Sequence, residues 1–373
     1  MKLSFQIPRE LIEERRQRIR DVWEYKKVDY IPILMSVYSN PWGYSVKEMM
    51  LDHEKLFKVN LETVKNSLKM IPDDYLPAMR PDVGCIVIAS AFGAEVYYGP
   101  NPEQTPYIKK PIIKNINEVY KLDIPDPYRD GLMPRGLECI RYFVENTDYK
   151  IPVSCLDMGG PINVAGDLLG TDLLFFAMYE APEALHHLLD LLAETFVLFA
   201  DVSIKAAGGI DNITCTDFPS IWCPEGRKGH VSDDLCASYS PEFFNKFSKP
   251  ANNKIFKRFG GGMLHNCGPN PCLSEYLNHD PPIKDVDLSY QYSKDDLQKI
   301  SETFAGRGIV YFYFENTPPQ HVLEEYRYIM ETLAPEVVAI PCFEVFPQDP
   351  VEEIYRHFLV ISREYARRME WKR

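Results

Sequence analysis

The stretch "GIVYFYFENTPPQHVLEEYRYIMETLAPEVVAIPCFEV", residues 308–345, decides the fold of this chain. It contains two apolar runs, 308–316 and 336–345, rich in the β-branched and aromatic residues of buried strands. Between them, 318–334 repeats its apolar residues at the spacing of an amphipathic helix. A strand, a helix and a second strand in this order predict two parallel strands joined by a crossover helix.

The same alternation runs through the chain from about residue 150 onward. Further strands are expected at 151–159, 209–218, 258–268 and 283–290, and further helices at 181–207, 240–256, 270–277, 293–306 and 349–371. Apolar runs at 29–37 and 82–98 are expected to be two earlier strands, separated by a helical stretch at 45–70. Eight strands alternating with helices favour a (β/α)8 TIM barrel over an open doubly wound sheet.

We expect a single α/β domain at 1–373, with an N-terminal helical extension at 1–28 and the (β/α)8 barrel at 29–373. The charged helix of the extension has two interpretations, a solvent-exposed face or an oligomer contact such as that of a homodimer. Two excursions interrupt the repeat, a proline-rich stretch at 97–136 and a loop at 219–234. Because loops after barrel strands lie on the catalytic face, the second is either a lid or an inert surface insertion.

Composition argues against several classes of function. The chain has 373 residues, a formal net charge of -13 and a pI of about 5.2, so an extended surface for nucleic acid is not expected. No apolar run is long enough to cross a membrane, and residues 1–11 lack the pattern of a secretory signal. No Gly-rich nucleotide-binding motif is present. The nine scattered cysteines indicate a reducing cytoplasm rather than a disulfide framework.

One pair of residues points to chemistry. His265 and Cys267, in "GGGMLHNCG", stand two residues apart at the end of an expected strand, so their side chains point to the same side. Cys342 lies near the end of the last expected strand, and closure of the barrel would bring all three to one end. One nitrogen and two sulfur ligands suit Zn²⁺, and three protein ligands leave an open position, as in catalytic sites. The alternative is a His–Cys pair buried for packing alone.

Several stretches resemble the uroporphyrinogen decarboxylase-like superfamily. They are "IPVSCLDMGGPINVAGDLLGTDLLFFAMYEAPEALHHLLD" at 151–190, "FGAEV" at 92–96, "YSPEFFNKFSKPANNKIF" at 239–256 and "MLHNCG" at 263–268. The resemblance covers residues 20–370 and implies a (β/α)8 barrel with an N-terminal helical extension. One branch of this superfamily decarboxylates porphyrinogens without a metal. Another comprises corrinoid-dependent methyltransferases with zinc on an H-x-C pair and a distant cysteine, a pattern that His265, Cys267 and Cys342 match.

Differences from both branches narrow the expected function. The decarboxylase branch has an arginine-rich loop after its first strand, where this chain has "LMSVYSNPWGYS" at 34–45. Cys342 is followed by "FEVFPQDPVEEI" rather than by the run usual in coenzyme M methyltransferases. No D-x-H-x-x-G string is present, so cobalamin is expected on a separate corrinoid partner protein. The favoured function is zinc-dependent methyl transfer from a small methoxylated, aromatic substrate to the Co(I) of that protein.

Three alternatives stay open: a methylcorrinoid:thiol methyltransferase, a metal-free decarboxylase, and a barrel that only binds a partner. For the favoured function, an aromatic slot for the substrate ring is expected from Tyr38, Trp42, Tyr44 and Trp222. Other polar groups at strand ends are candidate helpers, namely Asp157 and Asn316 for substrate binding and Asp217, Glu315 and Tyr290 for catalysis. Asp217 or Glu315 is also a candidate displaceable zinc ligand. The alternative role of each is ordinary packing or loop capping. His230 of the 219–234 loop has two interpretations, a residue that reaches the site or a solvent-exposed loop residue, and the second is favoured.

Overall fold

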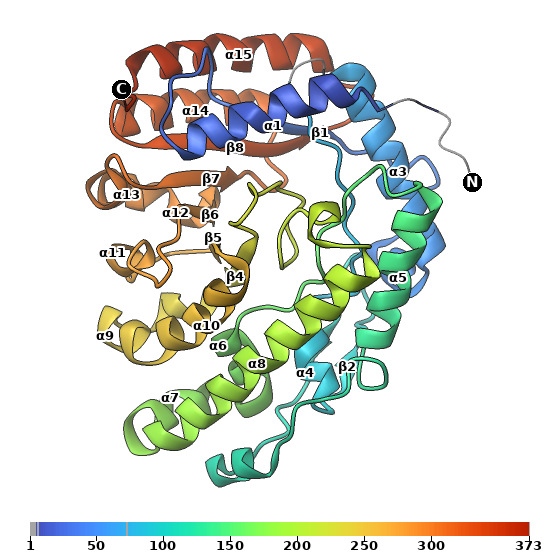
Figure 1. The fold of residues 1–373 in the computed structure, drawn as a ribbon, viewed down its shortest axis with the longest axis vertical. Helices are drawn as coiled ribbons and strands as arrows, with labels where there is room; N and C mark the ends of the chain where they lie inside the picture. Colours follow the sequence, from blue (N-terminus) through green and yellow to red (C-terminus); the bar gives the residue numbers. More distant parts are fainter. Residues whose placement is uncertain (1–4, 6, 72–73, 373) are drawn as a thin grey trace.

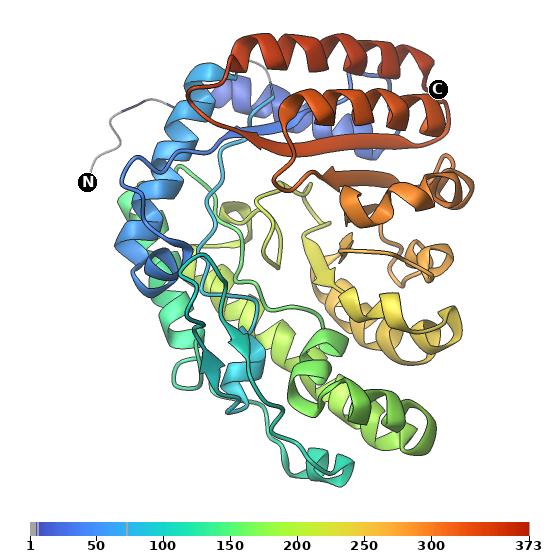
Figure 2. The ribbon, with the colours of Figure 1, turned by 180° about the vertical axis from the view of Figure 1, so that it is seen from behind.

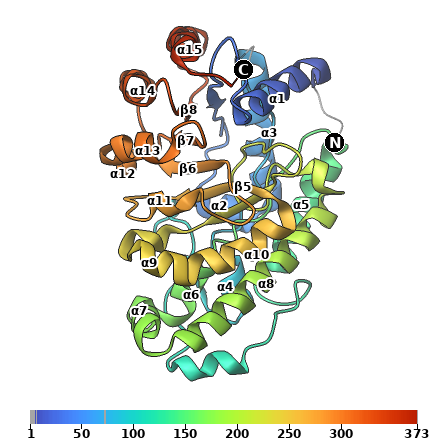
Figure 3. The ribbon, with the colours of Figure 1, turned by 60° about the vertical axis from the view of Figure 1, so that its left-hand side comes forward.

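A parallel sheet forms the centre of the molecule. The computed structural model describes residues 5, 7–71 and 74–372. Six strands lie in the order β1-β8-β7-β6-β5-β4, and all five neighbouring pairs are parallel. Figure 3 shows β8, β7, β6 and β5 stacked in this order with helices outside them. The strands are β1 (Leu34–Val37), β4 (Gly229–Ser232), β5 (Gly261–Asn266), β6 (Asp285–Ser289), β7 (Ile309–Tyr313) and β8 (Val338–Val345).

Shorter parallel contacts continue the ring beyond β4. The Thr216 N–H donates to the Lys228 carbonyl at 2.9 Å, directly before β4. Single-residue parallel bridges then join Ile213 to Val153 and Val153 to Met79. These segments continue the parallel arrangement from β4 toward the region of β1 (Figure 1). The predicted (β/α)8 TIM barrel is therefore confirmed, although one side of it is built from isolated bridges rather than from continuous strands.

Helices surround the sheet and cover its outer face (Figure 1). They are α1 (Arg9–Trp23), α2 (Val46–Leu51), α3 (His53–Met70), α4 (Val87–Ala91), α5 (Met133–Asn146), α6 (Pro161–Leu169), α7 (Thr171–Glu180), α8 (Pro182–Ala206), α9 (Pro241–Phe243), α10 (Lys249–Phe259), α11 (Leu273–Tyr276), α12 (Tyr290–Ser293), α13 (Leu297–Phe304), α14 (Pro319–Leu333) and α15 (Val351–Arg368). Taken singly, no helix of the described residues is long and apolar enough to cross a membrane. The sharply bent pair α6 and α7 reaches that length and composition only when the two are taken together.

The strand expected at 82–98 is wrong. Its apolar centre forms the buried helix α4, and its end forms β2 (Val96–Tyr97), which pairs with β3 (Tyr107–Ile108) in a small antiparallel hairpin. Figure 2 shows this hairpin beside α4 and away from the main sheet. A short, continuous apolar run does not distinguish a buried strand from a buried helix. The barrel position instead belongs to Met79, whose flanking Pro77 and Pro81 hide the strand signal in the sequence.

Two other expectations need correction. The helical stretch at 45–70 is two helices, because Asp52 ends α2 and caps α3 by accepting the N–H groups of Glu54 and Lys55. The stretch 219–234, expected to be a loop, contains the buried barrel strand β4. The proline-rich stretch at 97–136 holds the β3 strand, the 3-10 helix Ile116–Lys121 and the start of α5.

A buried carboxylate ties the N-terminal helix to the barrel. Asp74 accepts hydrogen bonds from the Arg18 guanidinium of α1 at 2.8 Å, the Tyr355 hydroxyl of α15 at 3.0 Å and the Ile33 N–H at 3.3 Å. Burial raises the pKa of Asp74 to about 6, despite the nearby Arg18, so the group is ionised at pH 7. Three separate segments of the chain therefore meet on one side chain.

We predict that Asp74→Ala lowers the free energy of unfolding by about 3 kcal/mol, because it leaves buried donors without their acceptor. Urea and thermal denaturation at pH 7 measure this loss. The matched control is Asp123→Ala, at an exposed position, which is expected to change stability by less than about 0.5 kcal/mol. Equal stability of the two variants would show that the carboxylate does not hold α1 to the barrel.

Candidate metal centre

Three neighbouring strands direct ionisable side chains into the barrel. The strand register places His265 of β5 beside Asp287 of β6, and Ser232 of β4 beside His265. His230, two residues before Ser232, points the same way. His230 and Asp287 are fully buried, and His265 is 8% exposed. His230 is thus an interior residue of the barrel, and its expected place in an exposed loop is wrong.

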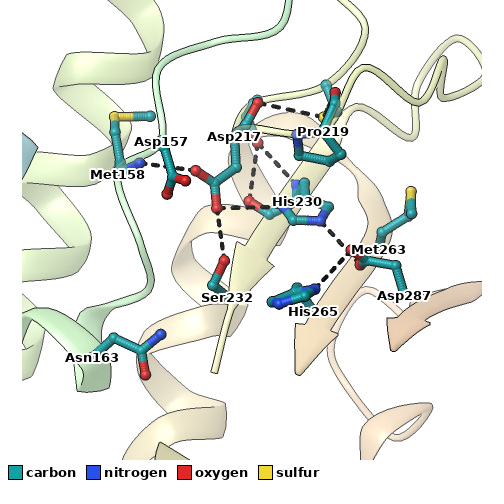
Figure 4. A network of polar contacts seen from close by, with 12 residues as sticks. Asp157, Met158, Asn163, Asp217, Pro219, His230, Ser232, Met263, His265 and Asp287 are labelled. Carbon is teal, nitrogen blue, oxygen red and sulfur yellow. Dashed lines mark hydrogen bonds and ion pairs between the residues drawn. The ribbon is translucent and has the colours of Figure 1, made fainter. Parts of the chain in front are cut away.

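Asp287 binds both histidines (Figure 4). One of its carboxylate oxygens lies 2.9 Å from His265 Nδ1, and the other lies 3.0 Å from His230 Nε2. The second nitrogen of His230 faces the carboxylate of Asp217 at 3.4 Å. Asp217 also accepts the Met158 N–H at 2.9 Å and the Ser232 hydroxyl at 3.2 Å.

The buried carboxylates and imidazoles shift one another's pKa values. Burial opposes ionisation, but the two histidines outweigh it and hold the pKa of Asp287 below its usual range. Burial likewise opposes protonation of His230, yet Asp287 and Asp217 raise its pKa to about 10. Burial also opposes protonation of His265, but Asp287 outweighs it and raises the pKa of His265 well above its usual value. The barrel interior therefore keeps a carboxylate charge on Asp287 and a proton on the His265 nitrogen that faces it.

The other nitrogen of His265 belongs to a group of possible metal ligands. His265 Nε2 lies 3.4 Å from Cys267 Sγ and 3.6 Å from an Asp234 carboxylate oxygen. Within the described part of the chain, the ligand atoms of Asp234, His265 and Cys267 all lie within 4.8 Å of one another. A nitrogen, a sulfur and an oxygen donor suit Zn²⁺, and a metal-bound histidine commonly donates its second N–H to a carboxylate, as His265 does to Asp287. The residues present therefore fit the ion that the sequence predicts.

Asp234 has other partners besides the histidine. Its carboxylate accepts the backbone N–H of Cys267 at 2.8 Å and the side-chain amide of Asn163 at 3.0 Å. These bonds join the segment after β4 to the turn that follows β5 and to α6. Asp234 therefore holds Cys267 in place, whether or not it is a ligand itself.

Cys342 is not brought into this group. It lies on β8, where it is the register partner of both Tyr313 and Leu34, and its thiol is buried. Its side chain lines a cavity of about 820 Å³, whereas Cys267 lines a separate cavity of about 560 Å³. The turn Glu315–Pro318 borders both cavities. The two cysteines thus line different cavities that share this short turn.

The larger cavity is apolar and aromatic. Its wall includes the predicted residues Tyr38, Trp222, Glu315 and Asn316. Other rings that line it are Phe218, Tyr311, Tyr313, Phe314 and Phe343. A planar ring of small size suits such a wall, since aromatic side chains pack favourably against one another's faces and edges.

Other predicted residues lie elsewhere. Trp42 and Tyr44 stack on each other, with 5.8 Å between ring centroids, outside the described lining of the larger cavity. The Tyr290 hydroxyl donates to Glu325 of α14, so it points toward the outer helices rather than toward the histidines. Asp157 lies beside the cavity, where it accepts a hydrogen bond from Arg80 at 2.9 Å. Burial and the nearby Asp217 raise the pKa of Asp157 to about 7.

Sequence reasoning missed Asp287 and Asp234, and it favoured an exposed position for His230 over a position in the site. "DVDLS" at 285–289 offered one signal, because its two acidic residues alternate with apolar ones in a strand that the barrel buries. A buried acidic residue needs a partner. Which partner it has depends on the register between strands, which the local sequence does not show.

Fold and site together define a class: a parallel α/β barrel with a nitrogen, sulfur and oxygen donor group at the carboxyl ends of its strands. The profile of the uroporphyrinogen decarboxylase (URO-D) family matches residues 14–354, and the chain belongs to this family. It is 30% identical over 128 residues to a uroporphyrinogen decarboxylase of Proteus mirabilis, a match that covers 32% of this chain and 34% of the relative. The chain thus spans about a third of that curated relative. A solved methyltransferase from Methanosarcina mazei shares the fold, with a TM-score of 0.68 and 19% identity over 94% of this chain and 98% of that one.

We predict that Asp287→Asn lowers the affinity for Zn²⁺ by about 10- to 100-fold, because the carboxylate orients His265 with Nε2 toward Cys267. Competition with a chromophoric chelator measures the affinity. Circular dichroism of the same sample checks that the barrel stays folded, and Asp123→Asn is the surface control. A folded Asp287→Asn protein with unchanged zinc affinity would rule out this orienting role.

Proposed function

We propose that this protein is a zinc-dependent methyltransferase that moves a methyl group from a small methoxylated aromatic substrate to the Co(I) of a separate corrinoid protein. The observation that carries the proposal is His265, held by Asp287 with its free nitrogen beside Cys267. The aromatic cavity next to this group and the fold shared with the Methanosarcina mazei methyltransferase support it.

We assign His265, Cys267 and Cys342 as the zinc ligands. Thiolates are softer donors than carboxylates and suit Zn²⁺ well. The group of close ligand atoms in the structure contains Asp234 and not Cys342, so this assignment requires Cys342 to move toward His265 when zinc binds. The oxygens of Asp234 already accept hydrogen bonds from the Cys267 N–H and from Asn163. The thiol of Cys342 contacts only the Ile340 carbonyl weakly, at 3.9 Å, among its described hydrogen-bond partners. The Cys342 thiol therefore has fewer hydrogen bonds to lose on binding zinc than the Asp234 carboxylate has.

Zinc, when bound at this site, would supply a Lewis acid that polarises the ether oxygen of the substrate. The rings of the cavity hold the substrate ring and exclude water from it. As the methyl carbon leaves, the electron pair of its C–O bond stays on the phenolic oxygen, which then takes a proton. Glu315 borders both cavities and accepts a hydrogen bond from the Ser289 hydroxyl at 2.9 Å. We assign it as the acid that gives this proton to the phenolic oxygen.

Methyl transfer to free cob(I)alamin tests the proposal. The purified protein, loaded with zinc, is given a panel of methoxybenzoates, methoxyphenols and simple thioethers, and formation of methylcobalamin is followed by absorbance. Transfer from an aromatic ether is the expected result. Methylation of a thiol by methylcobalamin, without transfer from any ether, would instead identify the thiol methyltransferase.

We predict that zinc content separates the two candidates for the third ligand. Cys342→Ser is expected to bind well below one zinc per chain and to lose methyl transfer, since a serine hydroxyl stays protonated near neutral pH and is a hard donor. Asp234→Asn is expected to keep its zinc. Plasma mass spectrometry measures the metal, with circular dichroism to check the fold. Loss of zinc in Asp234→Asn, with zinc retained in Cys342→Ser, would instead identify Asp234 as the third ligand.

We also predict that porphyrinogens are not decarboxylated. A substrate with many carboxylates needs cationic partners. Residues 34–45 contain no arginine, and the described lining of the larger cavity holds one cationic side chain, Arg80. Coproporphyrinogen formation from uroporphyrinogen is measured by fluorescence after oxidation. A rate above the protein-free background would favour the decarboxylase over the methyltransferase.

A further inference from the structure

The charges around the larger cavity are strongly unbalanced. Among its described lining residues, Arg80 is the one cationic side chain. The acidic side chains are Asp82, Glu315, Glu344 and Asp349. A ligand that enters this space therefore meets more negative than positive charge. Because the rest of the wall is mainly aromatic and aliphatic, few polar groups are available to screen an added anion.

Two carboxylates of the protein already share one nitrogen of the Arg80 guanidinium. Its Nη2 lies 2.9 Å from Asp157 and 3.2 Å from Asp82. Both carboxylates are mostly buried, and Asp82 lines the cavity. A carboxylate on a ligand would be the third acid on one guanidinium. Its attraction to Arg80 would be offset by repulsion from the two acids already bound there.

Phe218 connects this charged cluster to the histidines. The Arg80 guanidinium lies over its ring, 5.0 Å from the centroid. His265 and His230 each make a T-shaped contact with the same ring, with centroids 5.2 and 5.3 Å from its centroid. Phe218 also lines the cavity. A substrate ring packed against Phe218 would therefore lie near both the candidate metal centre and the Arg80–Asp82 pair.

We propose that the cavity selects uncharged methoxyphenols over methoxybenzoates, with Asp82 and Arg80 as the residues that set this preference. A phenolic hydroxyl can donate to the Asp82 carboxylate and accept from the Arg80 guanidinium, so both groups keep a partner and no net charge is buried. A benzoate adds a negative charge and offers no donor to Asp82. This inference rests on the proposed function for the choice of aromatic methyl ethers, but it concerns binding rather than turnover.

Isothermal titration calorimetry of the zinc-loaded protein at pH 7.5, with 2-methoxyphenol and 2-methoxybenzoate as probes, tests the preference. The wild-type protein is expected to bind the phenol at least about ten-fold more tightly than the benzoate. Asp82→Asn is expected to reduce the ratio of phenol affinity to benzoate affinity. The substitution leaves Arg80 with one acidic partner and so strengthens benzoate binding. Asp123→Asn, at an exposed position, is the control and keeps the wild-type ratio.

Tighter binding of the benzoate, lost in Arg80→Gln, would overturn the inference and make Arg80 a carboxylate anchor. An unchanged ratio in Asp82→Asn would also overturn it, and so would no detectable binding of either probe. The cob(I)alamin assay distinguishes this failure from failure of the proposed function. Preferential phenol binding without any methyl transfer would support the selectivity and contradict the proposed methyltransferase. Methyl transfer mainly from methoxybenzoates would support the methyltransferase and contradict the selectivity.

Discussion

Asp287 is a carboxylate without solvent contact that holds two imidazoles, one from each of the two strands before its own. A buried charge of this kind is tolerated only with close and well-oriented partners, and removing one partner is costly. The arrangement therefore constrains the register of β4, β5 and β6, because a slip of one residue would turn these side chains out of the barrel. It also determines which nitrogen of His265 is left to face Cys267. The chemistry of the site depends on this one carboxylate.

The rest of the site follows from how the barrel closes around that core. The carboxyl ends of β5, β7 and β8 lie on one face, so Cys267 and Cys342 line neighbouring cavities, and Glu315 borders both of them. Phe218 joins the histidines to the larger cavity by direct ring contacts. The aromatic wall and the surplus of carboxylates then decide what can enter. Family membership alone would not distinguish an anionic porphyrinogen from a small uncharged ring, but the charge of this cavity bears directly on that choice.

Much of the barrel was predictable because the periodicity of apolar residues within short segments identifies many of its helices and strands. The strand–helix–strand unit at 308–345 forms β7, α14 and β8 as expected. The His265–Cys267 pair was predictable for the same reason, since strand periodicity alone places both side chains on one side. Prediction failed where the local signal was ambiguous. The apolar run at 82–98 became a helix, the proline-flanked Met79 took the barrel position, and β4 formed inside an expected loop.

By itself, the sequence determined the class of fold and the presence of a histidine and a cysteine poised at a strand end. Periodicity and residue spacing are local properties, so they can be recognised in one segment without knowledge of the rest of the chain. Only the tertiary structure decided that Asp287 and Asp234 accompany these residues, that Cys342 borders the neighbouring cavity, and that Tyr290 points away. The reason is that contacts between distant strands depend on register and on closure of the ring, which arise from the packing of the whole barrel rather than from any one segment.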